Sequence, residues 1–252
     1  MKKTMVSILC LAYNEEDFIK EALDSFLMQR TNFPFEIVVQ DDASTDGTTN
    51  IIREYESKYP KIVHPIYQTE NQYKKMQHPS MFVFAAARGK YNADCDGDDY
   101  WTDPLKLQKQ VDFLEVNPDY VMCYHDWNIL SNRVFHRGCQ KKDFTQDELI
   151  TDPTGVLPST RMYRNLFSNK TRKDFDDFRG DYPFNVLMGT FGKCKYIDGI
   201  LPSIYRIHGR NIWSSMSSQK QAEAIKNMHK RLYDLMVERG NPHYIQLRRG
   251  CL

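Results

Sequence analysis

Short apolar stretches alternate with amphipathic ones along the first 120 residues, and this alternation restricts the fold more than any other feature of the sequence. Four apolar runs have the length and composition of buried β-strands, namely residues 5–12, 36–39, 62–67 and 90–93. Helical spacing or helix-start residues follow each run, in segments around residues 14–27, 48–55, 79–87 and 103–117. Strands that alternate with helices predict an α/β fold with a mostly parallel sheet flanked by helices on both faces.

Two of these helices have residues that are typical of a helix start. Asn14 is expected to cap the first helix, with Asp17 at its third position, and Asp103 followed by Pro104 is expected to start the fourth. The second half of the chain is less periodic, and its first part is expected to form loops and short helices over the site. The spacing then predicts further elements in three segments, a helix from residue 181, strands over 194–207 and a basic amphipathic helix over 219–239.

Acidic turns follow two of the predicted strands, at Asp41–Asp46 and at Asp94–Asp99. In open parallel sheets, ligands bind outside the carboxyl ends of the strands. Because both turns stand at such ends, the sequence predicts a ligand-binding site at this edge of the sheet.

The second acidic turn has four carboxylates within six positions, Asp94, Asp96, Asp98 and Asp99. Like charges at this spacing repel one another, and a divalent metal with a preference for oxygen ligands, Mg²⁺ or Mn²⁺, would relieve the repulsion. A solvated acidic loop is the alternative. A calcium loop of the EF-hand type is excluded, since its sixth and twelfth positions would be Asp99 and Leu105 instead of Gly and Glu.

Several classes of protein are disfavoured by the sequence. No apolar run approaches the roughly 18 residues of a membrane helix, and we interpret the apolar start as a strand because it continues into charged residues without a cleavage site. The six cysteines form no Cys-x-x-Cys pair, which argues against a zinc site and favours a reducing cytoplasm. Neither dinucleotide-binding nor P-loop glycine motifs occur, and no nucleic-acid-binding motif is recognisable.

Charge is distributed unevenly although the net charge is +1. Residues 1–130 carry 13 Lys and Arg against 21 Asp and Glu, whereas residues 131–252 carry 21 against 12. This asymmetry fits a metal site in the first half and anionic contacts in the second, but it does not require either.

Five motifs in this order resemble family 2 glycosyltransferases with the GT-A fold, a Rossmann-like arrangement of sheet and helices. The matching segments cover roughly residues 4–210 and are Val6-Ser7-Ile8-Leu9 with Ala12-Tyr13-Asn14-Glu15, Ile37–Thr48, Ala87–Tyr91, Asp96–Trp101 with Pro104, and Gly180-Asp181-Tyr182 with Tyr205–His208. Each motif alone is weak, and their conjunction carries the resemblance.

The resemblance implies that residues from several of these motifs bind a nucleotide-sugar donor. Asp41 and Asp42 match an acidic pair that accepts hydrogen bonds from the base, which suits the imide N–H of uracil; shaping a turn is the alternative role. Arg206 and Arg210 are candidates for holding the diphosphate. The remaining donor-binding candidates are Ala12, Tyr13, Asn14, Glu15, Lys74, Arg88 and Asp96.

The same resemblance implies a divalent metal on the diphosphate and a carboxylate base. Asp98 is expected to be the direct metal ligand, with Asp96 nearer the ribose, Asp99 in support and His208 as a further ligand; a lone histidine is also commonly structural. Asp181 matches the general base of the family. Two alternatives stay open for the base, a simple helix-capping role for Asp181 and the rival carboxylates Asp176 and Asp177.

The resemblance implies an inverting glycosyltransferase that uses a nucleotide-diphosphate sugar, with a UDP-sugar as the first expectation, in bacterial surface polysaccharide or glycoconjugate synthesis. The acceptor is expected to be a glycan or a lipid-linked glycan. A nucleotidyltransferase and a non-catalytic nucleotide-sugar-binding module of the same fold are the alternatives. The first lacks its usual Gly-rich loop here, and the second has no use for a base.

The predicted domain organisation consists of a GT-A domain over 1–215, divided into a donor-binding half (1–130) and an acceptor-binding half (131–215), and a helical extension over 216–252. The extension is basic, so it could rest on an anionic membrane surface or pack on the domain with its charges in water. The expected location is the cytoplasm, with peripheral contact at the inner face of the plasma membrane as one option.

Overall fold

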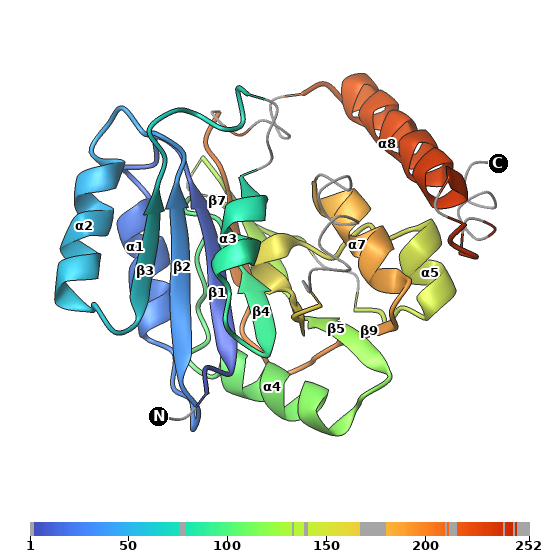
Figure 1. Cartoon of the computed structure of the whole chain (residues 1–252), viewed down its shortest axis with the longest axis horizontal. Coiled ribbons are helices and arrows are strands. Elements are labelled where there is room, and N and C mark those ends of the chain that lie inside the picture. Colours follow the sequence, from blue (N-terminus) through green and yellow to red (C-terminus); the bar gives the residue numbers. More distant parts are fainter. Residues whose placement is uncertain are drawn as a thin grey trace.

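The computed structural model describes residues 3–75, 79–132, 134–138, 141–166, 180–209, 211, 216–238, 240–243 and 245. Its first half contains four parallel strands, each followed by a helix (Figure 1). In chain order these are β1 (Val6–Ala12), α1 (Ile19–Leu27), β2 (Phe35–Asp41), α2 (Thr48–Lys58), β3 (Val63–Tyr67), α3 (Ser80–Ala86), β4 (Tyr91–Asp94) and α4 (Lys106–Val116). The prediction of alternating strands and helices is confirmed.

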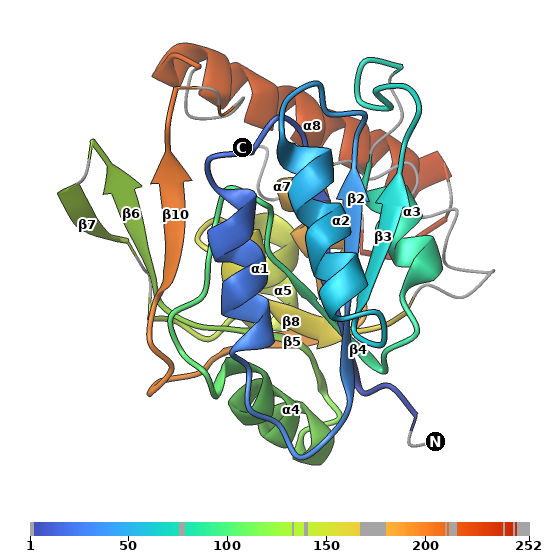
Figure 2. The ribbon, with the colours of Figure 1, turned by 90° about the vertical axis from the view of Figure 1, so that its left-hand side faces the viewer.

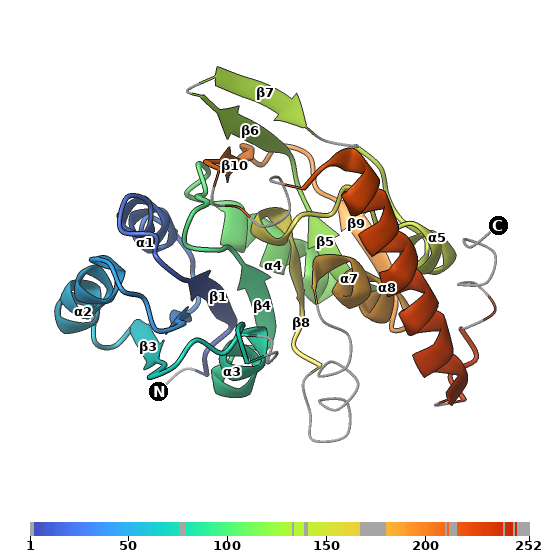
Figure 3. The same ribbon diagram turned by 90° about the horizontal axis from the view of Figure 1, so that it is seen from above.

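The second half extends this sheet and adds a smaller one. Its elements are β5 (Tyr120–Tyr124), β6 (Trp127–Ser131), β7 (Val134–Gly138), α5 (Gln146–Thr151), η1 (Pro158–Thr160), β8 (Met162–Arg164), α7 (Asp181–Gly189), β9 (Lys193–Tyr196), β10 (Ser203–Ile207) and α8 (Ser218–Glu238). The large sheet has the order β3-β2-β1-β4-β8-β5-β9, with β8 antiparallel to both neighbours, and the small sheet has the order β10-β6-β7. Figures 2 and 3 show the small sheet standing apart at one side of the molecule. The middle region thus contains strands that the sequence did not predict.

Side chains of β1 alternate between two apolar layers. Ile8 and Cys10 face a core built with α1, α2 and α4, whereas Leu9 faces Val83 of α3 on the other side of the sheet. Because consecutive residues of a strand point to opposite faces, a continuous apolar run is the pattern of a strand covered by helices on both faces. This is why the short run could be assigned to a central parallel strand.

Both predicted helix starts are displaced in the structure. Asn14 does not cap α1, which begins at Ile19 after Phe18; its side-chain oxygen instead accepts the backbone N–H of Thr45 at 2.8 Å. Asn14 adopts a left-handed backbone conformation with φ of 55°, which breaks the path into the helix. Asp103 accepts the N–H of Leu105 at 2.8 Å, one turn before α4 becomes regular.

The helix α8 packs against α7, and Figures 1 and 3 show the two side by side. Its residues Leu232 and Met236 are buried in the core of the second half, while Lys226 and Lys230 are exposed. This contact supports packing on the domain as the role of the apolar face of α8. None of the helices in the described part of the chain combines the length and the apolar character that crossing a bilayer requires.

A buried lysine of α4, Lys106, makes a stability prediction possible. Its Nζ donates to Gln110 at 2.7 Å and lies 4.2 Å from the ring centroid of Trp101, and burial lowers its pKa from 10.5 to about 8. Below pH 8 the folded protein must keep the side chain of Lys106 protonated in an apolar site, whereas the unfolded chain holds the same charge in water. Lys106→Met is therefore expected to raise the free energy of unfolding at pH 7 by about 1–3 kcal/mol.

Urea unfolding of wild type and Lys106→Met at pH 7 and pH 10 measures this effect. The unfavourable contribution of Lys106 is full below the folded-state pKa and fades as the pH approaches the unfolded value of 10.5. The gain in the variant should therefore shrink between the two pH values. A variant that is less stable than wild type at pH 7 would show that the contacts to Gln110 and Trp101 outweigh the cost of burial.

Candidate active site

The acidic turn after β4 is held at the carboxyl edge of the sheet by β1. The backbone N–H groups of Cys95 and Gly97 donate to Leu9 and Leu11 at 3.0 and 2.8 Å. A Cβ at Gly97 would lie 2.2 Å from Oε2 of Glu15, so the turn runs close above this half-buried side chain. The glycine lets the carboxylates of the turn project from a backbone that lies directly on the end of β1.

Asp98 meets two polar side chains that follow β10. Its Oδ2 lies 3.0 Å from Nε2 of His208 and 3.0 Å from Nδ2 of Asn211. Asn211 in turn accepts the backbone N–H of His208 at 2.8 Å and fixes this corner. The structure thus brings together two of the predicted metal ligands across 110 residues of sequence.

Asp96 and Asp99 contribute unfavourable charge to the same corner. Burial, followed by the nearby Asp98, raises the pKa of both carboxyls well above its ordinary value. Glu15 shows the same behaviour, because burial first and then Asp98 and Asp96 raise its pKa. A cation placed among these groups would stabilise their charged forms.

The donor set at this corner fits a divalent metal. Asp98 offers a carboxylate and His208 an imidazole, which are ligand types that would suit Mn²⁺. Within the described ranges, no group of three or more His, Cys, Asp or Glu side chains is arranged to hold a metal.

Arg206 holds the turn that carries Asp98 through a hydrogen bond to its backbone and contacts with neighbouring side chains. Its Nη1 donates to the backbone oxygen of Asp98 at 2.7 Å, its Nη2 pairs with Glu21, and its Cζ lies 5.1 and 4.6 Å from the ring centroids of Phe18 and Tyr100. With 9% of its side chain exposed, the guanidinium is committed to these contacts. These contacts give Arg206 a structural role at the turn, and its role in holding the diphosphate stays a prediction. Its companion candidate, Arg210, lies outside the described residues.

The acidic pair Asp41 and Asp42, at the end of β2, shapes the neighbouring loops. Asp41 accepts the N–H of Ser44 at 3.0 Å, and Asp42 accepts the N–H groups of Gln72 and Tyr73 at 2.8 and 3.2 Å. Both carboxylates are nearly buried. The turn-shaping alternative is therefore supported, although a carboxylate has further lone pairs with which to accept a hydrogen bond from a base.

The loop tied down by Asp42 brings Lys74 to the same edge. The Nζ of Lys74 lies 5.8 Å from the ring centroid of Tyr13, whose side chain follows β1 and is 36% exposed. This places a cation and an aromatic face beside the acidic pair. Both remain candidates for contact with a donor.

Arg88 lies at the opposite edge of the sheet. Its backbone N–H donates to Oγ of Ser7 at 3.1 Å and its Nε to the buried carboxylate of Glu36 at 2.7 Å. Ser7 and Ala12 stand near opposite ends of β1, about 17 Å apart along an extended strand. The prediction that Arg88 meets the donor is therefore corrected, because this arginine precedes β4 and the site follows it.

Asp181 opens α7 and is 61% exposed. It does not cap this helix, because Gly180 holds the capping position with φ of 96° and no side chain caps the helix. Its charge raises the pKa of Asp96, after the larger effects of burial and of Asp98. Its rivals Asp176 and Asp177 lie outside the described residues.

Three residues of the candidate site were not predicted from the sequence. Arg161 is buried between Asp94 and Asp181, and Tyr163 donates to Asp94 at 2.7 Å. Asn211, at the Asp98 corner, is the third. Arg161 and Tyr163 belong to a segment without a periodic pattern, and single polar residues of this kind give no signal until the fold is known.

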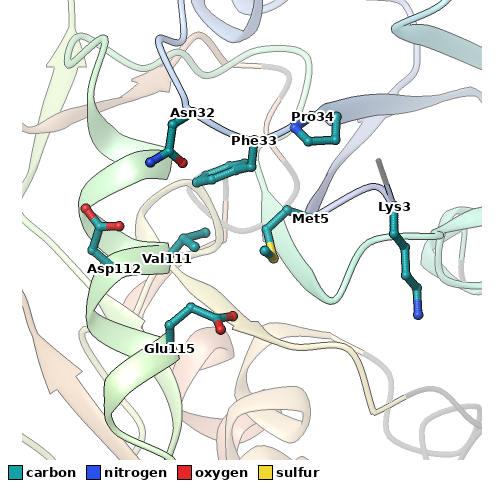
Figure 4. Close-up of a pocket in the computed structure, with 8 residues that line it drawn as sticks. All are labelled: Lys3, Met5, Asn32, Phe33, Pro34, Val111, Asp112 and Glu115. Carbon is teal, nitrogen blue, oxygen red and sulfur yellow. The ribbon is translucent and has the colours of Figure 1, made fainter. Parts of the chain in front are cut away.

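A hollow of about 500 Å³ lies between the start of β1, the loop before β2 and α4 (Figure 4). Met5, Phe33 and Val111 form its apolar wall, and Asp112 and Glu115 lie on its α4 side. Because Met5 directly precedes β1, the hollow opens at the amino edge of the sheet. It is therefore separate from the acidic site at the carboxyl edge.

Comparison with known sequences finds relatives that match most of this chain. An uncharacterized protein of Mycobacterium tuberculosis is 34% identical over 225 residues, which cover 86% of this chain and 62% of that protein. The chain thus spans less than two thirds of the length of this relative.

Two solved structures share the fold at low sequence identity. TarS 1-349 of S. aureus, in complex with UDP-GlcNAc, superposes with a TM-score of 0.65 at 19% identity, covering 90% of this chain and 66% of that one. The mannosyltransferase PcManGT from Pyrobaculum calidifontis, in complex with GDP-Man and Mn²⁺, gives a TM-score of 0.63 at 16% identity, covering 99% and 69%. The predicted GT-A fold is confirmed. Residues 7–182 match the family model for Glycosyl transferase family 2, and the chain belongs to this family.

Proposed function

We propose that this protein transfers a sugar from a nucleotide-diphosphate donor to an acceptor hydroxyl with inversion at the anomeric carbon. The observation that carries the proposal is the arrangement at one sheet edge. The Asp98–His208 corner offers a metal and diphosphate site, and the exposed carboxylate of Asp181 is connected to the same acidic turn through Arg161 and Asp94. Direct displacement needs a leaving group stabilised on one side of the sugar and a base on the other.

Each of these residues has a distinct role in the proposed reaction. A divalent ion bound by Asp98 and His208 would stabilise the negative charge that develops on the leaving diphosphate. Asp181 takes the proton of the acceptor hydroxyl as its oxygen attacks the sugar. Asp99 accepts the backbone N–H of Arg206 at 3.0 Å and thereby keeps the metal-binding turn in place.

The donor proposed first is a UDP-sugar. Asp41 and Asp42 lie beside Tyr13 and Lys74, and a carboxylate there can accept the imide N–H of uracil. The related structures hold either UDP-GlcNAc or GDP-Man, which supports a nucleotide sugar as the class and makes the base a question for experiment.

The proposed acceptor is a glycan or lipid-linked glycan of bacterial surface polysaccharide or glycoconjugate synthesis. The exposed face of α8 supports contact with anionic lipid or glycan, because it carries four basic side chains, Lys220, Lys226, Lys230 and Arg231. Three acidic side chains on the same helix, Glu223, Asp234 and Glu238, reduce this effect.

A donor panel tests the proposal. Purified protein with Mn²⁺ is incubated with UDP- and GDP-sugars and a set of glycan and lipid-linked acceptors, and released nucleoside diphosphate and glycosylated product are both quantified. We expect UDP release that depends on metal and acceptor, with the new linkage inverted relative to the donor. Release of pyrophosphate from a nucleoside triphosphate and a sugar phosphate would instead identify a nucleotidyltransferase. Donor binding without product would identify a binding module.

A further inference from the structure

Arg161, the residue before β8, is buried between Asp94 and Asp181, with 4% of its side chain exposed. Its Nε and Nη2 lie 2.8 and 2.5 Å from Oδ2 of Asp94, and its Nη1 donates to Oδ1 of Asn185 at 3.0 Å. Its Nη2 also pairs with Oδ1 of Asp181 at 3.5 Å. A buried guanidinium is stable only when its charge and its N–H groups are matched in this way.

Three residues from the start of α7 face this guanidinium. Asp181, Phe184 and Asn185 stand at positions i, i+3 and i+4, which lie on one side of a helix. The ring centroid of Phe184 is 4.2 Å from Cζ of Arg161, and the amide of Asn185 donates onward to the backbone oxygen of Val156 at 3.0 Å. The first turn of α7 is thus docked on Arg161 by an ion pair, a stacked ring and a hydrogen bond.

The other side of Arg161 is tied to the acidic turn. Asp94 is the last residue of β4, and its second oxygen accepts the hydroxyl of Tyr163 at 2.7 Å. Asp94 therefore belongs to the arginine contact, although its sequence position groups it with the carboxylates of the metal-binding turn. Arg161 connects the end of the strand that leads into the turn with Asp96 and Asp98 to the helix that carries Asp181.

We propose that Arg161 is a positioning residue that fixes the carboxylate of Asp181 relative to the metal-binding turn. This inference rests on the proposed function, in which Asp181 is the general base. The contact at Oδ1 leaves the other oxygen of the carboxylate to accept the acceptor proton. The planar guanidinium can hold Asp94, Asn185 and Asp181 at once, whereas a lysine ammonium has no such fork. A displacement of about 1 Å between reacting groups can cost about 10²-fold in rate.

Arg161→Lys tests this role, and Arg164→Lys is the matched control. Arg164 lies three residues further along, at the end of β8, and donates to the backbone oxygens of Tyr120, Leu114 and Asn117 away from the site. Both changes keep the charge and remove a hydrogen-bonding fork. We expect Arg161→Lys to lower kcat by about 10²-fold with the Kd for donor and metal within about threefold of wild type. Arg164→Lys should keep kcat within about threefold, even if its Tm falls.

The measurements are kcat and KM for both substrates, calorimetric donor binding and Tm for each variant. A folded Arg161→Lys protein with the kcat of wild type overturns the inference, as does equal loss of kcat in both variants. If Arg161→Lys fails to fold, Asn185→Ala replaces it; loss of this partner should lower kcat about tenfold without changing donor Kd, and an unchanged kcat overturns the inference. A wild-type protein that binds donor but transfers no sugar to any acceptor contradicts the proposed function itself, and the inference fails with it.

Discussion

Asp181→Asn is expected to lower kcat by about 10²–10⁴-fold, because an amide cannot take the proton of the acceptor hydroxyl. The substitution keeps the shape of the side chain and leaves the Asp98 corner intact. Donor and metal should therefore bind with affinities close to those of wild type. Initial rates at saturating donor and acceptor, with calorimetric donor binding on the same preparations, measure both quantities.

Asp176→Asn and Asp177→Asn are the controls for this prediction, since these carboxylates are the rivals for the base in the sequence. Each should keep kcat within a few-fold of wild type. An Asp181→Asn protein with normal kcat, beside a rival variant that has lost activity, would move the base to that rival. Equal activity of all three variants would remove a single carboxylate base from the mechanism.

Asp98→Ala is expected to lower metal-dependent turnover by at least about 10²-fold, the effect of removing electrostatic stabilisation from a leaving group. His208, whose Nε2 lies 3.0 Å from Oδ2 of Asp98 in the wild type, would remain as a protein ligand of the metal. His208→Ala should have a smaller effect, about tenfold, because the carboxylate contributes charge as well as a ligand atom. Titrations of turnover against Mn²⁺ concentration separate weaker metal binding from lost catalysis.

Asp112→Ala is the matched control, because it removes an exposed carboxylate of α4 at the other edge of the sheet. It should leave the Mn²⁺ dependence unchanged. If Asp98→Ala retained the wild-type rate and Mn²⁺ dependence, the metal would have to bind elsewhere, and the acidic turn would be a solvated loop.

The position of the candidate site at the carboxyl edge of the sheet could be predicted because it depends on local sequence patterns. Continuous apolar runs identified the strands, and the acidic turns followed them directly, so that Asp41 and Asp98 were placed at the carboxyl edge before the structure was known. The same rule could have excluded Arg88, since this residue precedes its strand. Local order along the chain is thus sufficient to decide at which edge a residue lies.

Contacts between distant segments could not be predicted in this way. Arg206 is held by Phe18, Tyr100 and Glu21, from two segments about 100 and 185 residues away, and no sequence spacing indicates such a pairing. Arg161 is similar, because its segment lacks periodicity and its partners come from β4 and α7. Whether an arginine supports a turn or contacts a ligand is decided by these tertiary contacts.

Calorimetric titration of nucleoside diphosphates, with and without Mn²⁺, tests the central claim most directly when wild type and Asp98→Ala are compared. The claim is that the acidic edge is a metal-dependent nucleotide-sugar site. We predict that UDP binds wild type only with Mn²⁺ present and that Asp98→Ala loses this binding. If no nucleoside diphosphate binds wild type under either condition, or if UDP binds equally without Mn²⁺ and to the variant, the claim is contradicted.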